Sequence, residues 1–288
     1  MQNQDENSAF MANYSIQIRG NLIDLSTPRI MGIINLTPDS FYAQSRQAND
    51  QALLKKCESM INEGATFLDL GAFSSRPGAE MISEKEEKVR LLTALQKIRN
   101  TFPEVYLSID TYRSSIARLA INEGADAIND ISGGLFDDNM FETMAELQTP
   151  YFLMHMKGEP KSMQHKPQYE NVFTEIFAFF KKQIDQLNRY GVKDVILDPG
   201  FGFGKSLAHN YSLLRNLAQF HALNCPLLVG LSRKGMIQKV IHQDADRALN
   251  GTTAAHVLAL LNGAQILRVH DVKAAKEAIQ IVDFYQKQ

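Results

Sequence analysis

Eight short apolar segments, spread evenly along the chain, constrain its fold more than any other feature of the sequence. They lie at residues 30–34, 66–70, 105–109, 125–129, 151–154, 195–197, 227–231 and 265–269. They do not alternate between polar and apolar residues, as is typical of strands buried on both faces, and each is followed by a longer segment with helical spacing. Because they recur about every 34 residues, each fits one strand–helix–strand unit. Eight such units predict an α/β fold, a closed (β/α)8 barrel of the TIM-barrel type.

The N-terminal part of the chain adds one small element to this barrel. The alternating segments 15–20 and 22–25 predict a short β-hairpin that closes the barrel bottom. Residues 1–13 are polar, so we expect a disordered tail there, with Met11 as a second possible start. Because no linker or low-complexity stretch follows, residues 14–288 are expected to form a single domain.

Charge and cysteine content exclude several classes of partner. The 288 residues include 30 lysines and arginines against 32 aspartates and glutamates, a net charge of −2. Nothing therefore indicates a nucleic-acid or membrane partner, and no apolar run reaches the length of a membrane span. Cys57 and Cys225 show neither disulfide-framework nor metal-site spacing, which suits a reducing cytoplasm.

The segment 195–205 carries Asp198 from an apolar strand into a loop rich in glycine and phenylalanine. Gly204 occupies the place of the last glycine of a nucleotide-binding P-loop, but Pro199 stands where the first glycine is required. The dinucleotide fingerprint fails too, because Leu207 stands where its third glycine would follow Gly204. These glycines therefore serve a purpose other than holding a triphosphate.

Polar residues end almost all of the apolar runs, at the strand ends where a barrel of this type places its active site. They are Asn35, Asp69, Asp110, Asn129 with Asp130, His155, Asp198, Ser232 with Arg233 and Lys234, and Arg268 with His270. Taken singly, Asp110 could cap a helix and His155 could be a hydrogen-bonded core histidine. For Asp69 and Asp130 a structural role is at least as well supported as a role in a site. Eight coincident polar ends favour a site.

Four of these residues predict a flat heterocyclic ligand. Asp110, Asn129, Asp198 and Lys234 would meet at one barrel mouth, where burying them without a ligand is unfavourable. An amidine-like edge, with a ring N–H and an exocyclic amine, would face Asp198 and Asn129. A carbonyl and a ring nitrogen on another edge would face Lys234.

A second group of residues predicts a phosphate or diphosphate site. Arg268 and His270 lie two residues apart and share one strand face, and Arg76 lies in the loop 74–78. A salt bridge from Arg268 to a neighbouring carboxylate is the structural alternative, and the weaker one, because the adjacent strand ends already carry polar partners. Asn35 offers an oxygen to a Mg²⁺ ion that also contacts the diphosphate.

Seven segments, in order along the chain, carry a specific family pattern. They are GIINLTPDSF at 32–41, SRPG at 75–78, SIDT at 108–111, INDI at 128–131, the strand and loop at 195–205, LSRK at 231–234 and RVHDV at 268–272. In these segments the chain resembles the dihydropteroate synthase family, from about Ile16 to the last helix. The resemblance implies a (β/α)8 barrel, usually a homodimer, that condenses 6-hydroxymethyl-7,8-dihydropterin diphosphate with 4-aminobenzoate. The products are 7,8-dihydropteroate, a folate precursor, and diphosphate; Mg²⁺ is the cofactor, and sulfonamides compete with 4-aminobenzoate.

The resemblance also implies roles for individual residues. It implies that the pterin contacts Asp110, Asn129, Ile131, Met154, Asp198 and Lys234. It implies that diphosphate contacts Asn35, Arg76, Arg268 and His270, with Asn35 also at the metal, and that 4-aminobenzoate contacts Ser75, Pro77, Phe203 and Ser232. The implied catalytic set is Asp110, Lys234, Arg268 and His270. Diphosphate would leave first, and the anionic Asp110 would stabilise the pterin methylene cation before the arylamine attacks.

Two loops depart from the family pattern. Where the family has SDGG after Phe41, this chain has a tyrosine followed by Ala43, Gln44 and Ser45, and where the family has GGESTRPG, residues 71–78 read GAFSSRPG. We expect the first change to slow turnover or alter loop order without abolishing activity.

Two alternatives remain open. One is a pterin-dependent methyltransferase barrel, which has no diphosphate to hold; Arg268, His270 and the loop 75–78 argue against it. The other is a non-catalytic pterin-binding protein whose altered first loop cannot close.

Overall fold

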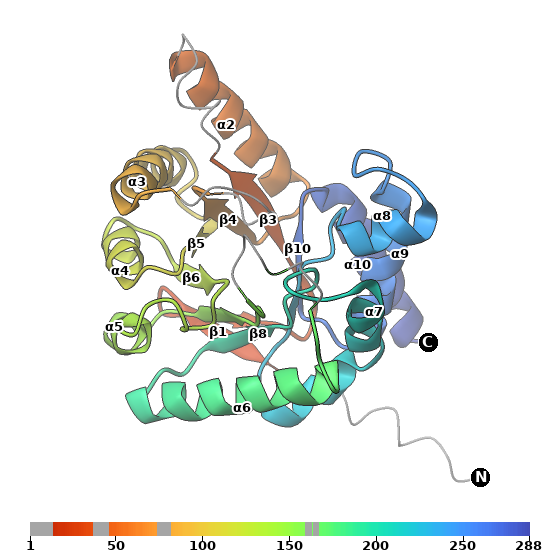
Figure 1. The fold of residues 1–288 in the computed structure, drawn as a ribbon. Coiled ribbons are helices and arrows are strands. Elements are labelled where there is room, and N and C mark those ends of the chain that lie inside the picture. Colours follow the sequence, from red (N-terminus) through yellow and green to blue (C-terminus); the bar gives the residue numbers. More distant parts are fainter. Residues whose placement is uncertain (1–13, 37–45, 74–81, 159–162, 164–166) are drawn as a thin grey trace, which may run out of the picture.

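A barrel of parallel strands forms the centre of the computed structural model, which describes residues 14–36, 46–73, 82–158, 163 and 167–288 (Figure 1). The strands are β3 (Arg29–Asn35), β4 (Phe67–Gly71), β5 (Tyr106–Asp110), β6 (Ala127–Asp130), β7 (Tyr151–Met154), β8 (Val195–Asp198), β9 (Leu228–Val229) and β10 (Ile266–Val269). They pair in the order β8-β7-β6-β5-β4-β3-β10-β9. A parallel bridge between Leu197 and Leu227 joins the two ends of this order. The predicted barrel is confirmed.

Helices follow the strands and surround the barrel (Figure 1). They are α2 (Arg46–Asn62), α3 (Glu84–Thr101), α4 (Ser114–Asn122), α5 (Met140–Leu147), α6 (Val172–Tyr190), α7 (Leu207–Arg215), the 3-10 helix η2 (Leu217–Leu223), α8 (Gly235–Ile241), α9 (Leu249–Leu261) and α10 (Val272–Gln286). Ser83 caps α3 through the backbone N–H of Glu86, while the Glu86 carboxylate pairs with Arg90. Within the described part of the chain, no helix has both the length and the apolar character that crossing a bilayer requires.

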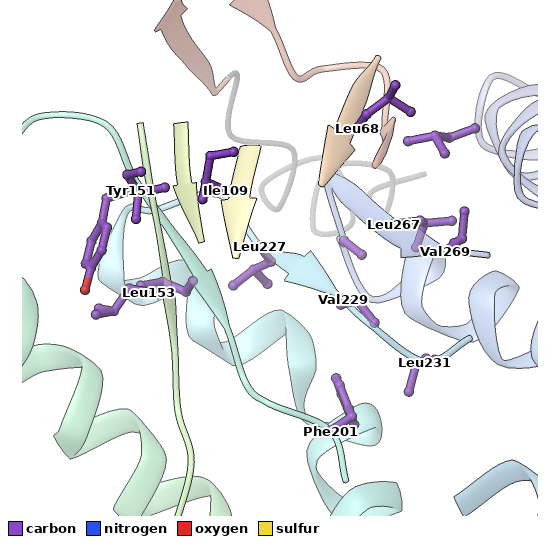
Figure 2. Packing of buried hydrophobic residues seen from close by; sticks show 14 of the residues in the cluster. Leu68, Ile109, Tyr151, Leu153, Phe201, Leu227, Val229, Leu231, Leu267 and Val269 are labelled. Atoms are coloured by element: carbon purple, nitrogen blue, oxygen red, sulfur yellow. The ribbon is translucent and has the colours of Figure 1, made fainter. Parts of the chain in front are cut away.

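Strand side chains alternate between two faces, as the two-residue period of a β-strand requires. One set, including Leu68, Ile109 and Leu153, packs between the strands and the helices (Figure 2). The other set points into the barrel. Its lower layer contains Met31, Phe67, Ala127, Phe152, Ile196, Leu228 and Ile266.

The N-terminal hairpin covers this lower layer. Strands β1 (Ser15–Ile18) and β2 (Asn21–Asp24) pair antiparallel. Ile16, Ile18 and the nearby Leu25 are almost completely buried in the same apolar cluster as the lower barrel layer. The predicted hairpin at the barrel bottom is therefore confirmed. Because it covers this end of the barrel, a ligand-binding site is expected at the opposite end.

Candidate active site

The upper layer of the barrel interior brings together the polar side chains of different strands. Asp69 follows Phe67 by two positions, so it points into the barrel one layer higher. The same step leads from Ala127 to Asn129, and the same period places Asp198, Arg268 and Asp110 on the interior face of their strands. By contrast, Asp130 lies on the other face and accepts hydrogen bonds from Tyr151 and Ser132, so its role is structural.

Arg268 joins two carboxylates at the centre of this layer. Its Nη2 lies 2.6 Å from Asp69 Oδ2 and 2.9 Å from Asp110 Oδ2, and its Nε donates to Asp69 at 2.7 Å. The prediction that a salt bridge to a carboxylate is the weaker alternative for Arg268 is wrong. Closure of the barrel places β10 near β4 and β5, and this proximity between residues far apart in sequence brings the three groups together. Neither ion pair uses Nη1.

The Asp110 carboxyl is strongly perturbed by its surroundings. Burial raises its pKa to about 7, Arg268 opposes that shift, and the nearby Asp69 adds to it. Its Oδ1 is buried and has no hydrogen-bond partner among the described residues. An oxygen in this state is unfavourable unless a ligand or solvent contacts it.

Asn129 and Asp198 each have one side-chain oxygen that accepts no side-chain hydrogen bond from another described residue. The Asn129 amide donates to Asp69 Oδ2 at 3.0 Å, which leaves its Oδ1 as an acceptor. Asp198 Oδ1 accepts the N–H of Gly200 at 2.8 Å, which leaves Oδ2. Burial raises the pKa of Asp198, and the charge of Lys234 partly offsets this. Two acceptors from neighbouring groups suit a ligand edge that carries N–H donors.

Lys234 supplies the opposite charge. Its ammonium donates to the carbonyl of Phe201 and lies 4.8 Å from the centre of the Phe203 ring, a cation–π contact. Burial lowers its pKa to about 8, and Asp198 opposes that change. Lys234 can therefore donate a hydrogen bond to a ligand, and it also stabilises the neighbouring Phe203 ring.

Lys205 stabilises the loop that presents Phe203. The Lys205 ammonium is buried and lies 2.9 Å from the carbonyl oxygens of both Gly200 and Phe203 and 3.1 Å from His155 Nδ1. Burial lowers the pKa values of both Lys205 and His155 well below their usual ranges. At Gly204 the backbone is left-handed, with φ of +62°, and a side chain there would meet the carbonyl of Lys157 at 2.2 Å. The loop glycine is thus needed for close backbone packing.

Ser232 and His270 lie together at the ends of β9 and β10. Ser232 Oγ accepts the backbone N–H of His270 at 3.2 Å and lies 3.1 Å from its Nδ1. Asn35, at the end of β3, is exposed. Among the described residues there is no cluster of three or more histidines, cysteines or carboxylates that could hold a metal. A cation at Asn35 would need further oxygens from a ligand and from water.

A cavity of about 850 Å³ opens over these residues. Of the predicted site residues, it is lined by Asn35, Asp110, Phe203, Ser232, Lys234, Arg268 and His270. Asn129, Asp198, Ile131 and Met154 are buried beside it without lining it. Ile131, Met154 and Phe203 belong to an apolar cluster with Tyr112, Met156 and Met163.

Several predicted residues fall outside the described residues, namely Ser75, Arg76 and Pro77, and the altered loop positions Ala43, Gln44 and Ser45. Sequence reasoning listed Asp69 among the polar strand ends without a definite role, and it assigned no role to two further participants, Lys205 and Met163. Asp69 pairs with Arg268, Lys205 holds the loop, and Met163 packs against the apolar side of the mouth. Asp69 and Lys205 could have been found from the sequence, since Asp69 lies near the end of a strand and Lys205 ends the glycine-rich loop. Met163 had none, because it lies in a long connection with no periodicity.

Comparison with known proteins gives consistent matches along almost the whole chain. The model of the pterin binding enzyme family matches residues 31–270. The dihydropteroate synthase of Escherichia coli K12 is 44% identical over 267 residues, which cover 92% of this chain and 94% of that protein.

Two solved structures are similar as well. The Yersinia pestis dihydropteroate synthase in complex with a sulfonamide drug has a TM-score of 0.89 and 40% identity, covering 96% of this chain and 100% of that one. The Xanthomonas albilineans dihydropteroate synthase with 4-aminobenzoic acid has a TM-score of 0.88 and 34% identity, with the same coverage of both chains.

Proposed function

The chain belongs to the dihydropteroate synthases, the pterin-binding transferases of folate biosynthesis, and on that premise we propose how its barrel mouth divides the reaction among its residues. The substrates are 6-hydroxymethyl-7,8-dihydropterin diphosphate and 4-aminobenzoate, and the products are 7,8-dihydropteroate and diphosphate. The observation that carries the proposal is the convergence of Asp110, Asn129, Asp198 and Lys234 on one barrel end.

The pterin binds with its hydrogen-bonding edges toward these four residues. Asn129 Oδ1 and Asp198 Oδ2 accept the ring N–H and the exocyclic amine, and Lys234 donates to the carbonyl and ring nitrogen on the other edge. Ile131 and Met154 contact the flat ring from the apolar side of the mouth. In support, burial raises the pKa of Asp198 and lowers that of Lys234, and perturbed pKa values of this kind are typical of groups at a binding site.

The diphosphate binds toward Arg268, His270 and Asn35. Arg268 keeps Nη1 outside its two ion pairs, and His270 lies on the same cavity wall. Within the described part of the chain no group of three or more histidines, cysteines or carboxylates accompanies Asn35, so its amide oxygen fits a Mg²⁺ ion that comes with the diphosphate. When bound, Mg²⁺ supplies positive charge next to the departing diphosphate. Arg76 would add to this charge, and it lies outside the described residues.

The arylamine binds next to Phe203 and Ser232; the resemblance assigns Ser75 and Pro77 to the same substrate, and both lie outside the described residues. The ring of Phe203 gives 4-aminobenzoate an apolar face. The Yersinia relative binds a sulfonamide and the Xanthomonas relative binds 4-aminobenzoic acid. We therefore propose that sulfonamides compete with 4-aminobenzoate in this chain too.

The site residues favour departure of diphosphate before attack of the arylamine. The Asp110 carboxylate lies at the centre of the mouth, with Oδ1 outside any hydrogen bond to described residues. As positive charge develops on the pterin methylene carbon, this fixed anion stabilises it, an effect typically of several kcal/mol. The arylamine nitrogen then bonds to that carbon and releases one proton to solvent. Phe203 and the apolar cluster limit the access of water to the cation.

We further propose that the chain acts as a homodimer in the cytoplasm. Helices α9 and α10 expose large apolar side chains: Leu258, Leu261, Ile281, Phe284 and Tyr285. A second copy of the chain would remove them from water. Both cysteines are free and buried, which suits a reducing compartment.

One assay distinguishes the synthase from the two alternatives. The protein is incubated with the dihydropterin diphosphate and Mg²⁺, with and without 4-aminobenzoate, and diphosphate and dihydropteroate are both quantified. A synthase forms the two products in equal amounts only when both substrates are present. Binding of the pterin substrate without any product would instead identify a non-catalytic pterin-binding protein. Transfer of a methyl group from a methylated pterin to a corrinoid, with no diphosphate released, would identify the methyltransferase.

A further inference from the structure

Arg233 adopts a strained backbone conformation between two residues of the site, Ser232 and Lys234. Its φ is +55°, in the left-handed region that is unfavourable for non-glycine residues by about 1 to 2 kcal/mol. Left-handed residues are common directly after helices, where Gln148 and His242 lie. Arg233 instead leads into helix α8, so helix termination does not explain its conformation.

The conformation of Arg233 is fixed from several directions. Its Nε and Nη2 donate to the two oxygens of Asp271 at 2.8 and 2.9 Å, a bidentate ion pair. Its Nη1 donates to the carbonyls of Ala245 and Asp246, both at 2.8 Å. Its backbone N–H donates to Thr252 Oγ1 at 3.0 Å. A strained residue persists when its surroundings determine its position in this way, and such strain is often associated with function.

These contacts connect the loop after β9 to the loop after β10 and to the connection between α8 and α9. The Arg233–Asp271 ion pair lies directly beside the Ser232–His270 contact, so two adjacent residues of one loop hold two adjacent residues of the other. Two neighbouring contacts fix both the distance and the relative orientation of the loops.

Arg233 also lines the cavity, which makes it a natural candidate for binding a substrate carboxylate. The contacts argue against that role, because Nε, Nη1 and Nη2 all donate to protein oxygens already. The Arg233 hydrogen bond lowers the pKa of Asp271, so the ion pair persists at neutral pH.

We propose that Arg233 and Asp271 are positioning residues that hold the strained turn and thereby direct Lys234 into the pterin pocket beside His270. The inference rests on the proposed function, since it assigns Lys234 to the pterin. The affinity for the dihydropterin diphosphate therefore depends on an ion pair that does not contact the substrate.

The test uses Arg233→Gly, Arg233→Lys and Asp271→Asn in the full chain. Glycine accepts the left-handed backbone without strain but lacks the guanidinium, and lysine keeps the charge without the planar fork. Arg118→Ala is the control, because Arg118 forms an exposed ion pair with Glu146. We expect the three variants to bind the dihydropterin diphosphate about 10- to 100-fold more weakly, as small misplacements of binding groups do, and the control to match the wild type.

A second arm separates positioning from a general structural role. Arg233→Gly is combined with Lys234→Ala, and the affinity of each variant is measured. If Arg233 acts through Lys234, Arg233→Gly causes little further loss once Lys234 is alanine. Equal losses in both backgrounds, or a lower melting temperature with unchanged affinity, would overturn the proposal.

A crystal structure of Asp271→Asn tests the inference without any substrate. We expect the Lys234 ammonium to move away from the Phe201 carbonyl, and an unmoved ammonium would contradict the positioning role. Wild-type protein that does not bind the dihydropterin diphosphate would refute the proposed function, while this structural readout would still decide the role of Arg233.

Discussion

Asp110 and Lys234 carry opposite charges at the barrel mouth, and burial brings the pKa values of both close to neutrality. The pKa of Asp110 rises to about 7 and that of Lys234 falls to about 8. In the proposed mechanism Asp110 must be anionic and Lys234 cationic. Both groups have the required charge only in a narrow range of pH between the two values.

We therefore expect a bell-shaped dependence of kcat/KM for the dihydropterin diphosphate on pH. Below about pH 7 Asp110 takes up a proton and its stabilising charge is lost, so activity falls as the pH decreases. Above about pH 8 Lys234 loses its proton and its charge, so activity falls as the pH increases. Steady-state kinetics from about pH 5 to about pH 10 measure both limbs. This range extends roughly two pH units beyond each pKa value.

Lys234→Arg provides the matched control for the alkaline limb. Arginine keeps its charge throughout this pH range, so the alkaline limb should disappear even though the variant is slower. An alkaline limb that persists unchanged in Lys234→Arg would show that another group is responsible.

Phe203→Ala tests the assignment of the arylamine pocket. Removing the ring takes away the apolar face for 4-aminobenzoate, and we expect its KM to rise about tenfold, as loss of an aromatic contact typically causes. The KM for the dihydropterin diphosphate should change much less. Phe136→Ala is the control, because Phe136 is a partly exposed ring that packs on Tyr112. Equal rises in both KM values would mean that Phe203 only packs the loop.

The position of the polar residues at the strand ends was predictable from sequence, because each apolar run is followed by a polar residue where the strand leaves the barrel. The pairing of Arg268 with Asp69 and Asp110 was not predictable in the same way. The three residues lie on separate strands, and only closure of the barrel brings them within hydrogen-bond distance. Sequence patterns report the face of each residue, whereas contacts across the barrel depend on its register.

At the scale of elements, the loop after β8 packs closely against the backbone of the loop after β7. Lys205 donates to two carbonyls of its own loop and contacts His155, and Gly204 packs directly against Lys157. The sequence showed that these glycines do not form a nucleotide loop. It did not show which neighbouring backbone they approach.

Gly204→Ala tests this packing, with Gly191→Ala as a matched control. Both glycines have positive φ, but a side chain at Gly191 would meet no atom within 4 Å, whereas one at Gly204 would meet the Lys157 carbonyl. We expect Gly191→Ala to lower the free energy of unfolding by about 1 to 2 kcal/mol through backbone strain. Gly204→Ala should cost about 1 to 3 kcal/mol more, because its neighbour is backbone and must move. Urea unfolding measures both, and equal losses would contradict the close packing.

All eight predicted strands and the hairpin are found, and every boundary agrees within two residues. The largest difference in length is at β9, which is only Leu228–Val229 where the apolar run covers 227–231. Apolar character marks burial, and Leu231 is buried without belonging to the strand. The apolar pattern therefore predicts that a strand is present, whereas hydrogen bonding to the neighbouring strands decides where the strand ends.

At the scale of the whole molecule, the barrel has three distinct regions. The hairpin covers the bottom, the polar residues line the mouth, and α9 and α10 expose apolar side chains on the outside. The hairpin and the mouth are accounted for by contacts within a single chain. The third suggests an additional subunit.

Phe284→Asp should convert the proposed dimer into a monomer. Phe284 is 68% exposed, and a charge there would be buried without a partner in a dimer interface. Size-exclusion chromatography with light scattering should give twice the chain mass of 32.4 kDa for the wild type and the single mass for the variant. Leu22→Asp, at a 75% exposed hairpin position, should remain dimeric. A monomeric wild type would contradict the proposed assembly.

The central claim is that the ends of the barrel strands form one pterin pocket, and the affinity of Lys234→Ala for the dihydropterin diphosphate tests it most directly. Removing a charged, partly buried donor should weaken binding by about 1.5 to 3 kcal/mol, which is about 10- to 150-fold. Lys239→Ala removes the same charge from an exposed position at the cavity rim and should leave the affinity nearly unchanged. Isothermal titration calorimetry of the three proteins gives the comparison. The account predicts a large loss for Lys234→Ala alone, and an affinity equal to that of the wild type would contradict it.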